Sequence, residues 1–429
     1  MKNYHRLLLI LALLFVCGAL PAHAEILTAP MAEDGDELDP ASLKDDRQEA
    51  WDFWRETMLA DETLKEETEN KAMTFGDATM RYTVEVFGEM PEGGYPLYIA
   101  MHGGGSGDTP DLNDSQWEDM QSYYTGGLDC GVYVAVRGVR DTWDTHFNPE
   151  SYPLYDRLIE YMILTENVNP NRVYLTGFSA GGDGVYAVGA RMADRFAAAN
   201  MSSGHPNSIS MVNYYHLPIQ LQAGESDTAY DRHIVTAQYG VLLDELQSEY
   251  EDGYEHRTLI HKDRGHNYED YDREPVEVYS DIYGYLSGEG SGTEMVDSYA
   301  PDWLDQFTRD PLPVTIRWDL GTRAELRETD FFYYLSADDG AEGIIQVRHD
   351  GNDVTVDTED FDGDFRIFFN EDMIDFSEPV HFELPDMGEL DVMLVPEEHW
   401  LNYTTFDRGD PYFQFEAAVS YEWLLENLE

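Results

Sequence analysis

Cysteine is scarce in this sequence, which has 2 cysteines among 429 residues. Cys17 falls in an N-terminal segment that we expect to be removed, so Cys130 would remain alone and no intramolecular disulfide could form. Because Cys130 stands just before the apolar stretch Gly131–Arg137, we expect it to be a small buried hydrophobic residue. The folded protein must then depend on its core and not on covalent cross-links.

Positive charge is also scarce, because 26 Lys and Arg stand against 86 Asp and Glu, a net charge of −60. The acidic residues run along the whole chain. A nucleic-acid partner is therefore excluded, since phosphate binding needs a basic face. Charge of this size predicts adaptation to saline surroundings, with loading by Ca²⁺ as the alternative. The lysines are Lys2, Lys44, Lys65, Lys71 and Lys262.

The N-terminus has the pattern of a secretory signal peptide. Basic residues precede the apolar run Leu7–Leu20, and the small residues Ala22 and Ala24 flank His23. The run is short for a membrane-spanning helix, although a membrane anchor is the alternative interpretation. We expect residues 1–24 to be a signal peptide cut after Ala24, and the protein to be secreted or periplasmic with no integral membrane segment after cleavage.

The rest of the chain divides into three predicted parts. Aromatic and apolar residues are plentiful, with hydrophobic residues at 42% and aromatic residues at 13% of the chain, so a sizeable core is expected. Residues 25–70 predict an acidic helical extension, in which Trp51 and Trp54 could attach one helical face to the core. A Gly/Ser-rich segment, Ser287–Thr293, marks the boundary between the parts 71–289 and 290–429.

Short apolar runs alternate with helix-compatible segments in residues 71–289. This rhythm predicts an α/β fold, with a mostly parallel sheet covered by helices on both faces. The predicted strands include 96–101, 131–137, 172–176, 197–201, 218–223 and 256–261, and the predicted helices are Tyr152–Leu164, Asp183–Ala193, Ile234–Tyr250 and Tyr271–Leu286. Residues 290–429 hold many short strand-like runs separated by turn residues, which predicts a small all-β domain.

The motif most informative about chemistry is Gly177-Phe-Ser179-Ala-Gly181, a G-x-S-x-G sequence. It stands directly after a predicted strand and directly before a predicted helix. In a nucleophile elbow the serine occupies a sharp strand-to-helix turn, and glycines on both sides let the backbones pass closely. We therefore predict that Ser179 is a nucleophile. The alternative is a Gly-rich turn without one.

A second glycine-rich segment, His102-Gly103-Gly104-Gly105, follows the earlier strand 96–101. Main-chain N–H groups of such glycines can approach a substrate oxygen closely, and the residue after the serine supplies a further donor. We predict an oxyanion hole formed by the amides of Gly103, Gly104 and Ala180. Taken alone, the segment could also be a phosphate-binding turn or a plain tight turn.

A nucleophilic serine needs a base and a carboxylate that orients it, in the chain order Ser, Asp or Glu, His. Asp227 follows the strand 218–223 and is our predicted orienting residue, with Glu225 as the alternative. His266 follows the last parallel strand and is the predicted general base. We expect no metal at His256, His261 and His266, because five-residue spacing does not align three side chains on one face.

These motifs resemble secreted α/β-hydrolases of the polyhydroxybutyrate depolymerase and dienelactone hydrolase-like type. The resemblance covers roughly residues 95–286 and implies an α/β-hydrolase fold, ester hydrolysis through an acyl-serine intermediate, and no cofactor. It also implies substrate-pocket positions near His102, Trp143 and His205, for which ordinary packing is the alternative. The predicted function is a secreted serine esterase acting on small or polymeric esters, of unspecified oligomeric state. The alternatives are a serine peptidase or other acyl hydrolase, and an inactive polymer-binding protein.

The charge pattern generates a first prediction. The melting temperature should rise when NaCl is raised from low concentration to about 1 M, because the Debye length then falls to about 3 Å and self-repulsion is screened. Thermal melts followed by circular dichroism measure the effect. A melting temperature that does not rise with NaCl would contradict adaptation to salt. An equal rise on adding millimolar CaCl₂ alone would favour the Ca²⁺ alternative.

Overall fold

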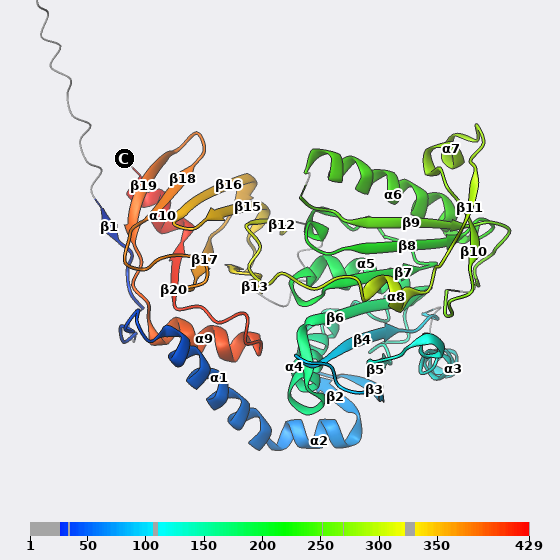
Figure 1. Ribbon diagram of the computed structural model, residues 1–429, viewed down its shortest axis with the longest axis horizontal. Coiled ribbons are helices and arrows are strands. Elements are labelled where there is room, and N and C mark those ends of the chain that lie inside the picture. The colour runs from blue at the N-terminus through cyan, green and yellow to red at the C-terminus, as the bar shows by residue number, and fades with distance from the viewer. Residues whose placement is uncertain are drawn as a thin grey trace, which may run out of the picture.

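The computed structural model describes residues 26–32, 35–105, 110–250, 252–268, 270–321 and 331–428 (Figure 1). The predicted signal peptide, residues 1–24, lies outside the described residues, as does Cys17. Within the described ranges, no helix is long and apolar enough to cross a lipid bilayer.

The largest element is a ten-stranded sheet with the order β11-β10-β9-β8-β7-β6-β4-β5-β3-β2. Strands β5, β4, β6, β7, β8 and β9 run parallel, β3 is antiparallel to β5, and β10 is antiparallel to β9. The strands are β2 Ala72–Phe75, β3 Ala78–Phe87, β4 Tyr95–Met101, β5 Gly131–Val136, β6 Val168–Phe178, β7 Ala198–Ser202, β8 Ile219–Gly224, β9 His256–His261, β10 Val276–Tyr279 and β11 Thr293–Val296.

Helices cover both faces of this sheet. Successive residues of β4 point to opposite layers, so Leu97 and Ile99 join the buried cluster that contains residues of α4 and α5, whereas Tyr98 and Ala100 join the cluster of α3 and α8. This strand order with helices on both faces is an α/β-hydrolase fold, as predicted. The helices are α3 Pro110–Met120, α4 Ser151–Glu166, α5 Ala180–Arg191, α6 Arg232–Glu249, α7 Ile282–Ser287 and α8 Ala300–Leu304.

The predicted helix over Tyr271–Leu286 is wrong in its first part. Strand β10 lies there, because Pro275 interrupts a helix and Val276 and Val278 are buried on alternate positions. The Gly/Ser-rich segment predicted as a domain boundary leads from α7 to β11, and β11 pairs with β10 at the edge of the same sheet. The large sheet therefore extends past residue 289.

The C-terminal part is β-rich but not all-β. A six-stranded sheet has the order β1-β19-β18-β16-β15-β12, and a four-stranded sheet has the order β13-β14-β17-β20. The predicted small β domain is therefore present, and it also contains two helices, α9 and α10, which bury Leu401 and Leu424. These elements are β12 Thr315–Asp319, β13 Phe331–Phe332, β14 Leu335–Ala337, β15 Glu342–Asp350, β16 Asp353–Asp362, β17 Phe365–Phe369, β18 Val380–Leu384, β19 Gly388–Met393, α9 Glu398–Arg408, β20 Ala417–Ser420 and α10 Tyr421–Asn427.

The N-terminal extension is helical and bridges the two parts (Figure 1). Its short strand β1, Leu27–Thr28, adds to the C-terminal sheet beside β19. Helix α1, Leu43–Ala60, contacts α9, and helix α2, Glu62–Asn70, contacts β2 of the large sheet. Trp54 is buried and its ring stacks on Trp51, so the predicted tryptophan face does attach the helix to the core.

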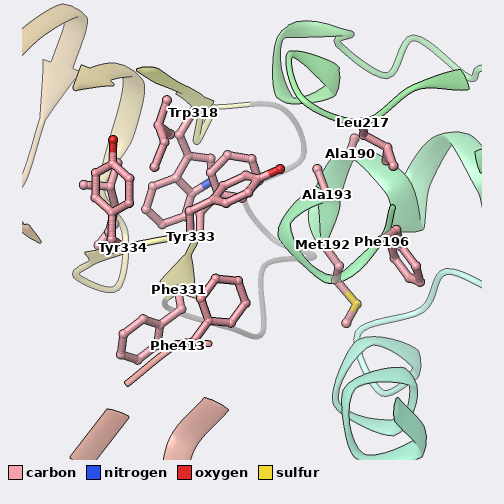
Figure 2. Close-up of a cluster of buried hydrophobic side chains, with 14 of the residues drawn as sticks. Ala190, Met192, Ala193, Phe196, Leu217, Trp318, Phe331, Tyr333, Tyr334 and Phe413 are labelled. Carbon is pink, nitrogen blue, oxygen red and sulfur yellow. The ribbon is translucent and has the colours of Figure 1, made fainter. Parts of the chain in front are cut away.

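The α/β part and the C-terminal part share one continuous core. Figure 2 shows aromatic residues of the C-terminal part, including Trp318 and Tyr333, beside Met192, Ala193 and Leu217 of the α/β part, and all five belong to the same buried cluster. Two buried ion pairs cross the same junction, Arg195 with Asp410 and Arg408 with Asp194. Beside them, Arg195 also pairs with Asp156 within the α/β part, and Arg309 pairs with Asp410 within the C-terminal part. Each of these buried charges therefore has a partner of opposite sign.

Cys130 differs from its prediction. It is partly exposed, and its thiol lies 3.3 Å from the carbonyl oxygen of Glu89. It precedes β5 and lies outside the buried core of the sheet, so it contributes little to core packing.

Candidate active site

Ser179 occupies a sharp bend between β6 and α5. Strand β6 ends at Phe178, α5 begins at Ala180, and Ser179 has a φ of 58° and a ψ of −118°. This conformation is strained for a residue with a side chain, so the surroundings must hold it. Two hydrogen bonds do so: the Ser179 N–H donates to the Ser202 carbonyl (2.8 Å), and the Ser179 carbonyl accepts from the Asp183 N–H (3.0 Å).

The two glycines of the G-x-S-x-G sequence are required by close contact of the backbone. A Cβ atom added to Gly177 would overlap the carbonyl oxygen of Gly181. A Cβ added to Gly181 would in turn overlap the carbonyl oxygen of Met101, the last residue of β4. Main chain cannot yield as a flexible side chain can, so this bend accepts only glycine at both positions.

The structure brings Ser179, His266 and Asp227 together in one chain of hydrogen bonds. His266 Nε2 lies 3.0 Å from Ser179 Oγ, and His266 Nδ1 lies 2.8 Å from Asp227 Oδ2. Asp227 is buried, whereas the His266 side chain is about one-third exposed and can be reached from solvent. Asp227 follows β8 and His266 follows β9, so both come from loops at the carboxyl edge of the sheet, where Ser179 also lies.

Glu225, the alternative orienting residue, points to other partners. Its carboxylate accepts hydrogen bonds from the Tyr279 hydroxyl (2.5 Å) and the Asp263 N–H (2.9 Å). The hydrogen bond from Tyr279 is the largest influence that lowers the pKa of Glu225. Glu225 therefore connects its loop to β10, and it is Asp227 that contacts the imidazole.

The predicted oxyanion residues lie beside Ser179. A Cβ added to Gly103 would lie 3.2 Å from the Ser179 Cβ, so the Gly103 backbone is next to the serine side chain. Gly104 has a φ of 113°, which favours glycine. Ala180 is the first residue of α5, where N–H groups have no acceptor within the helix.

His102 is buried behind this loop, so its predicted position in the substrate pocket is not observed. Its Nε2 accepts a hydrogen bond from the Gly138 N–H (3.1 Å), and its Nδ1 lies 2.5 Å from the Gly103 carbonyl. Burial lowers the pKa of His102 to about 4, so the ring is neutral near pH 7. The side chain holds the Gly103 loop against the loop that follows β5.

A cavity of about 390 Å³ opens beside the bend. Trp143 and His205, both predicted near the pocket, line it together with the candidate oxyanion residues Gly104 and Ala180. The remaining lining residues are Gly105, Asp183, Asn207, Tyr230 and Arg232. Its volume lies in the usual range of small-molecule sites.

Several polar residues near the bend were not expected from sequence. Asp183 stands four residues after Ser179 in the first turn of α5, and it accepts hydrogen bonds from the His205 N–H (2.7 Å) and from Asn207 Nδ2 (3.2 Å). Burial raises the pKa of Asp183 above its usual value. Asp183 could have been found from the sequence, because residues four apart at the start of a helix lie on the same face and Asp183 is four residues after Ser179. No local sequence pattern predicts that Arg232 lines the cavity.

A buried polar cluster lies beneath Ser202, whose carbonyl holds the Ser179 N–H. Asp270 accepts hydrogen bonds from Ser202 Oγ (2.5 Å), Tyr123 Oη (3.0 Å) and Tyr124 Oη (3.3 Å). Burial raises the pKa of Asp270 to about 6. The Asp270 carboxyl therefore holds the side chain of Ser202, and the Ser202 carbonyl in turn holds the Ser179 N–H at the bend.

The three histidines at five-residue spacing have separate contacts. His261 is buried with its Nε2 2.9 Å from Gln222 Oε1, and His256 Nδ1 lies 2.8 Å from the Tyr254 carbonyl. Among the described residues, no group of three or more His, Cys, Asp or Glu is arranged to hold a metal ion.

Comparison with known proteins gives similarity at the level of structure only. No protein-family model matches the chain, and no curated protein matches it. Solved structures that resemble it include a thermostable esterase, with 20% identity and a TM-score of 0.37 over 56% of this chain, which spans 62% of that chain's length. Another is LpqC, a poly(3-hydroxybutyrate) depolymerase from Bordetella parapertussis, with 14% identity and a TM-score of 0.38 over 54% of this chain and 88% of that one. The fold assignment rests on the strand order described above.

The Asp270 cluster generates a pH-dependent prediction. Because the folded-state pKa is about 6 and the unfolded value is about 4, the protonated carboxyl is favoured by folding, and this stability is lost as pH rises from about 4 to 6. The free energy of unfolding of Asp270→Asn minus that of the wild type should therefore increase by about 2–3 kcal/mol between pH 4 and pH 7.

Urea unfolding of both proteins in about 1 M NaCl measures this difference. Asp339→Asn, at an exposed residue, is the control and should show little such trend. A stability difference between Asp270→Asn and the wild type that is the same at pH 4 and pH 7 would contradict the prediction.

Proposed function

We propose that this protein is a serine hydrolase that cleaves carboxylic esters through an acyl-serine intermediate. The observation that supports it most strongly is the continuous chain Ser179 Oγ, His266, Asp227, with 3.0 and 2.8 Å between successive heavy atoms. Nucleophile, base and orienting carboxylate then stand at the distances that proton transfer needs. The strained bend that presents Ser179 beside the cavity supports the same function.

In the proposed first half-reaction, Ser179 Oγ attacks the ester carbonyl and its proton passes to His266 Nε2. The Asp227 carboxylate keeps the proton of the imidazole on Nδ1, so Nε2 is free to accept. The carbonyl oxygen becomes an oxyanion, which the N–H groups of Gly103, Gly104 and Ala180 stabilise, each donor by about 3–4 kcal/mol.

In the remaining steps the tetrahedral intermediate collapses. The bond between the carbonyl carbon and the alcohol oxygen breaks, and His266 gives its proton to the departing alkoxide, which leaves an acyl-serine. Water then attacks the acyl carbon, with His266 again accepting the proton. The second tetrahedral intermediate then breaks the bond between the acyl carbon and Ser179 Oγ, His266 returns its proton to Oγ, and the acid is released.

Three further proposals rest mainly on the sequence. We propose that residues 1–24 direct export, that the acidic surface is an adaptation to salt, and that the chain divides into the extension 25–70, the hydrolase part and the β-rich part. We move the end of the hydrolase part from residue 289 to about residue 308, because β11 and α8 belong to the large sheet and its covering layer.

Replacing the nucleophile tests the proposal directly. Ser179→Ala should lower kcat on 4-nitrophenyl butyrate by about 10⁶-fold while the circular dichroism spectrum is unchanged, because the mutation removes only Oγ. Ser122→Ala, at an exposed serine, is the matched control. The wild type and the control should react with a fluorophosphonate probe, and Ser179→Ala should not. Ester turnover that survives in Ser179→Ala would refute the assignment.

A second pair of variants separates the two candidate carboxylates. Asp227→Asn should lower kcat/KM by about 10⁴-fold, because an amide holds the imidazole in the wrong tautomer. Glu225→Gln removes a charge two residues before Asp227 but leaves the contact between Asp227 and the imidazole intact. It should lower kcat/KM by less than about tenfold. The opposite ranking, measured with 4-nitrophenyl acetate at pH 8, would transfer the orienting role to Glu225.

A further inference from the structure

The cavity beside Ser179 contains a cation whose hydrogen-bonding capacity is largely unused. Arg232 is the first residue of α6 and follows the loop that carries Asp227. It is the only Arg or Lys among the residues that line the described cavity, and its side chain is 11% exposed. A guanidinium placed there is largely removed from water yet still reaches the space beside the predicted oxyanion amides.

The N–H groups of Arg232 have few acceptors in the described part of the chain. Its Nη1 donates one long hydrogen bond, 3.4 Å, to the Ala229 carbonyl, and its Nε is buried with no acceptor. Arginine has five N–H donors. A buried donor without an acceptor costs free energy, so a ligand that supplies acceptor oxygens would be favoured at this position.

Two carboxylates lie near Arg232, but in the described part of the chain no hydrogen bond joins either of them to its guanidinium. Asp227 Oδ1 is 4.0 Å from Arg232 Nη1, beyond hydrogen-bond distance, and Asp227 Oδ2 contacts His266. Asp183 accepts from the His205 N–H with one oxygen and from Asn207 with the other. These carboxylates offset the charge of Arg232 without occupying its donors.

Aromatic rings complete the cavity around Arg232. Its guanidinium carbon lies 4.9 Å from the centre of the Tyr230 ring, and stacking of this kind orients the guanidinium plane. Tyr230 and Trp143 both line the cavity and are exposed, 76% and 51% respectively. Their rings offer apolar surface to the part of a ligand that lies next to an oxygen-bearing group.

We propose that Arg232 binds a carboxylate group carried by the substrate, on whichever half of the ester occupies this cavity. The substrates would then be monoesters of dicarboxylic acids or esters of hydroxy acids. Arginine suits this role because its planar fork pairs with the two oxygens of a carboxylate. Arg232 is thus a specificity-determining residue, and this inference rests on the proposed esterase function.

The test uses two pairs of esters that differ by one charge. 4-Nitrophenyl hydrogen adipate and its methyl ester carry the difference on the acyl half, and 4-acetoxybenzoate and its methyl ester carry it on the alcohol half. The readout is the ratio of kcat/KM for the acid over its methyl ester, in about 1 M NaCl so that the surface charge is screened. In the wild type, one pair should favour the acid by about tenfold or more.

Variants then assign that preference to Arg232. Arg232→Gln should lower the ratio by about 10- to 100-fold, and Arg232→Lys should retain part of it because the positive charge remains. Arg264→Gln makes the same charge change at an exposed residue outside the cavity lining, and should leave the ratio within about twofold. Thermal melts check that each variant is folded, and Arg232→Lys keeps the test valid if Arg232→Gln does not fold.

Two results would overturn the inference. The first is a wild type that prefers neither acid. The second is that Arg232→Gln lowers kcat/KM for all four esters but leaves the ratio of acid to methyl ester unchanged. Arg232 would then act by positioning Asp227 and not by binding the substrate carboxylate. Failure of the proposed function looks different, because the wild type would then hydrolyse none of these esters, or Ser179→Ala would hydrolyse them all.

Discussion

Three stretches of main chain meet behind Ser179, and their contact leaves no room for a side chain. The end of β4 at Met101, the end of β6 at Gly177 and the first turn of α5 at Gly181 lie within van der Waals distance of one another. This contact turns the chain within one residue and keeps Ser179 in a conformation with positive φ. The stability of the whole sheet therefore maintains the local strain, and the fold itself holds Ser179 in place.

The residues around the bend are supported in turn by polar contacts from other strands. The Ser202 carbonyl on β7 fixes the Ser179 N–H, and Asp270 binds the Ser202 hydroxyl. His102 similarly holds the Gly103 loop through the Gly103 carbonyl and the Gly138 N–H. Because these buried groups are satisfied by one another, a change in one of them should alter the geometry of the bend as well as stability.

The few positive charges of this acidic chain are used selectively. Arg195, Arg309 and Arg408 are buried where the β-rich part meets the α/β part, each beside an aspartate. Arg232 lies in the cavity next to Ser179. The surface, by contrast, keeps its excess of carboxylates, so salt should act mainly on the surface while the buried pairs are screened much less.

Sequence alone was sufficient for the parallel strands, for the bend at Ser179 and for the contact of Ser179 with His266 and of His266 with Asp227. Strand periodicity and the G-x-S-x-G sequence are local patterns, and Asp227 and His266 each follow a predicted parallel strand, so the sequence places both at the same edge of the sheet. It was insufficient where the outcome depended on packing between distant segments. Strand β10 replaced a predicted helix because a neighbouring strand edge was available for Val276–Tyr279 to pair with. His102 turned inward because the loop after β5 offered it a donor. Arg232 and Asp183 reached the cavity only because α5 and α6 begin at the same edge of the sheet, and contacts of this kind between elements far apart in the chain are decided by tertiary structure.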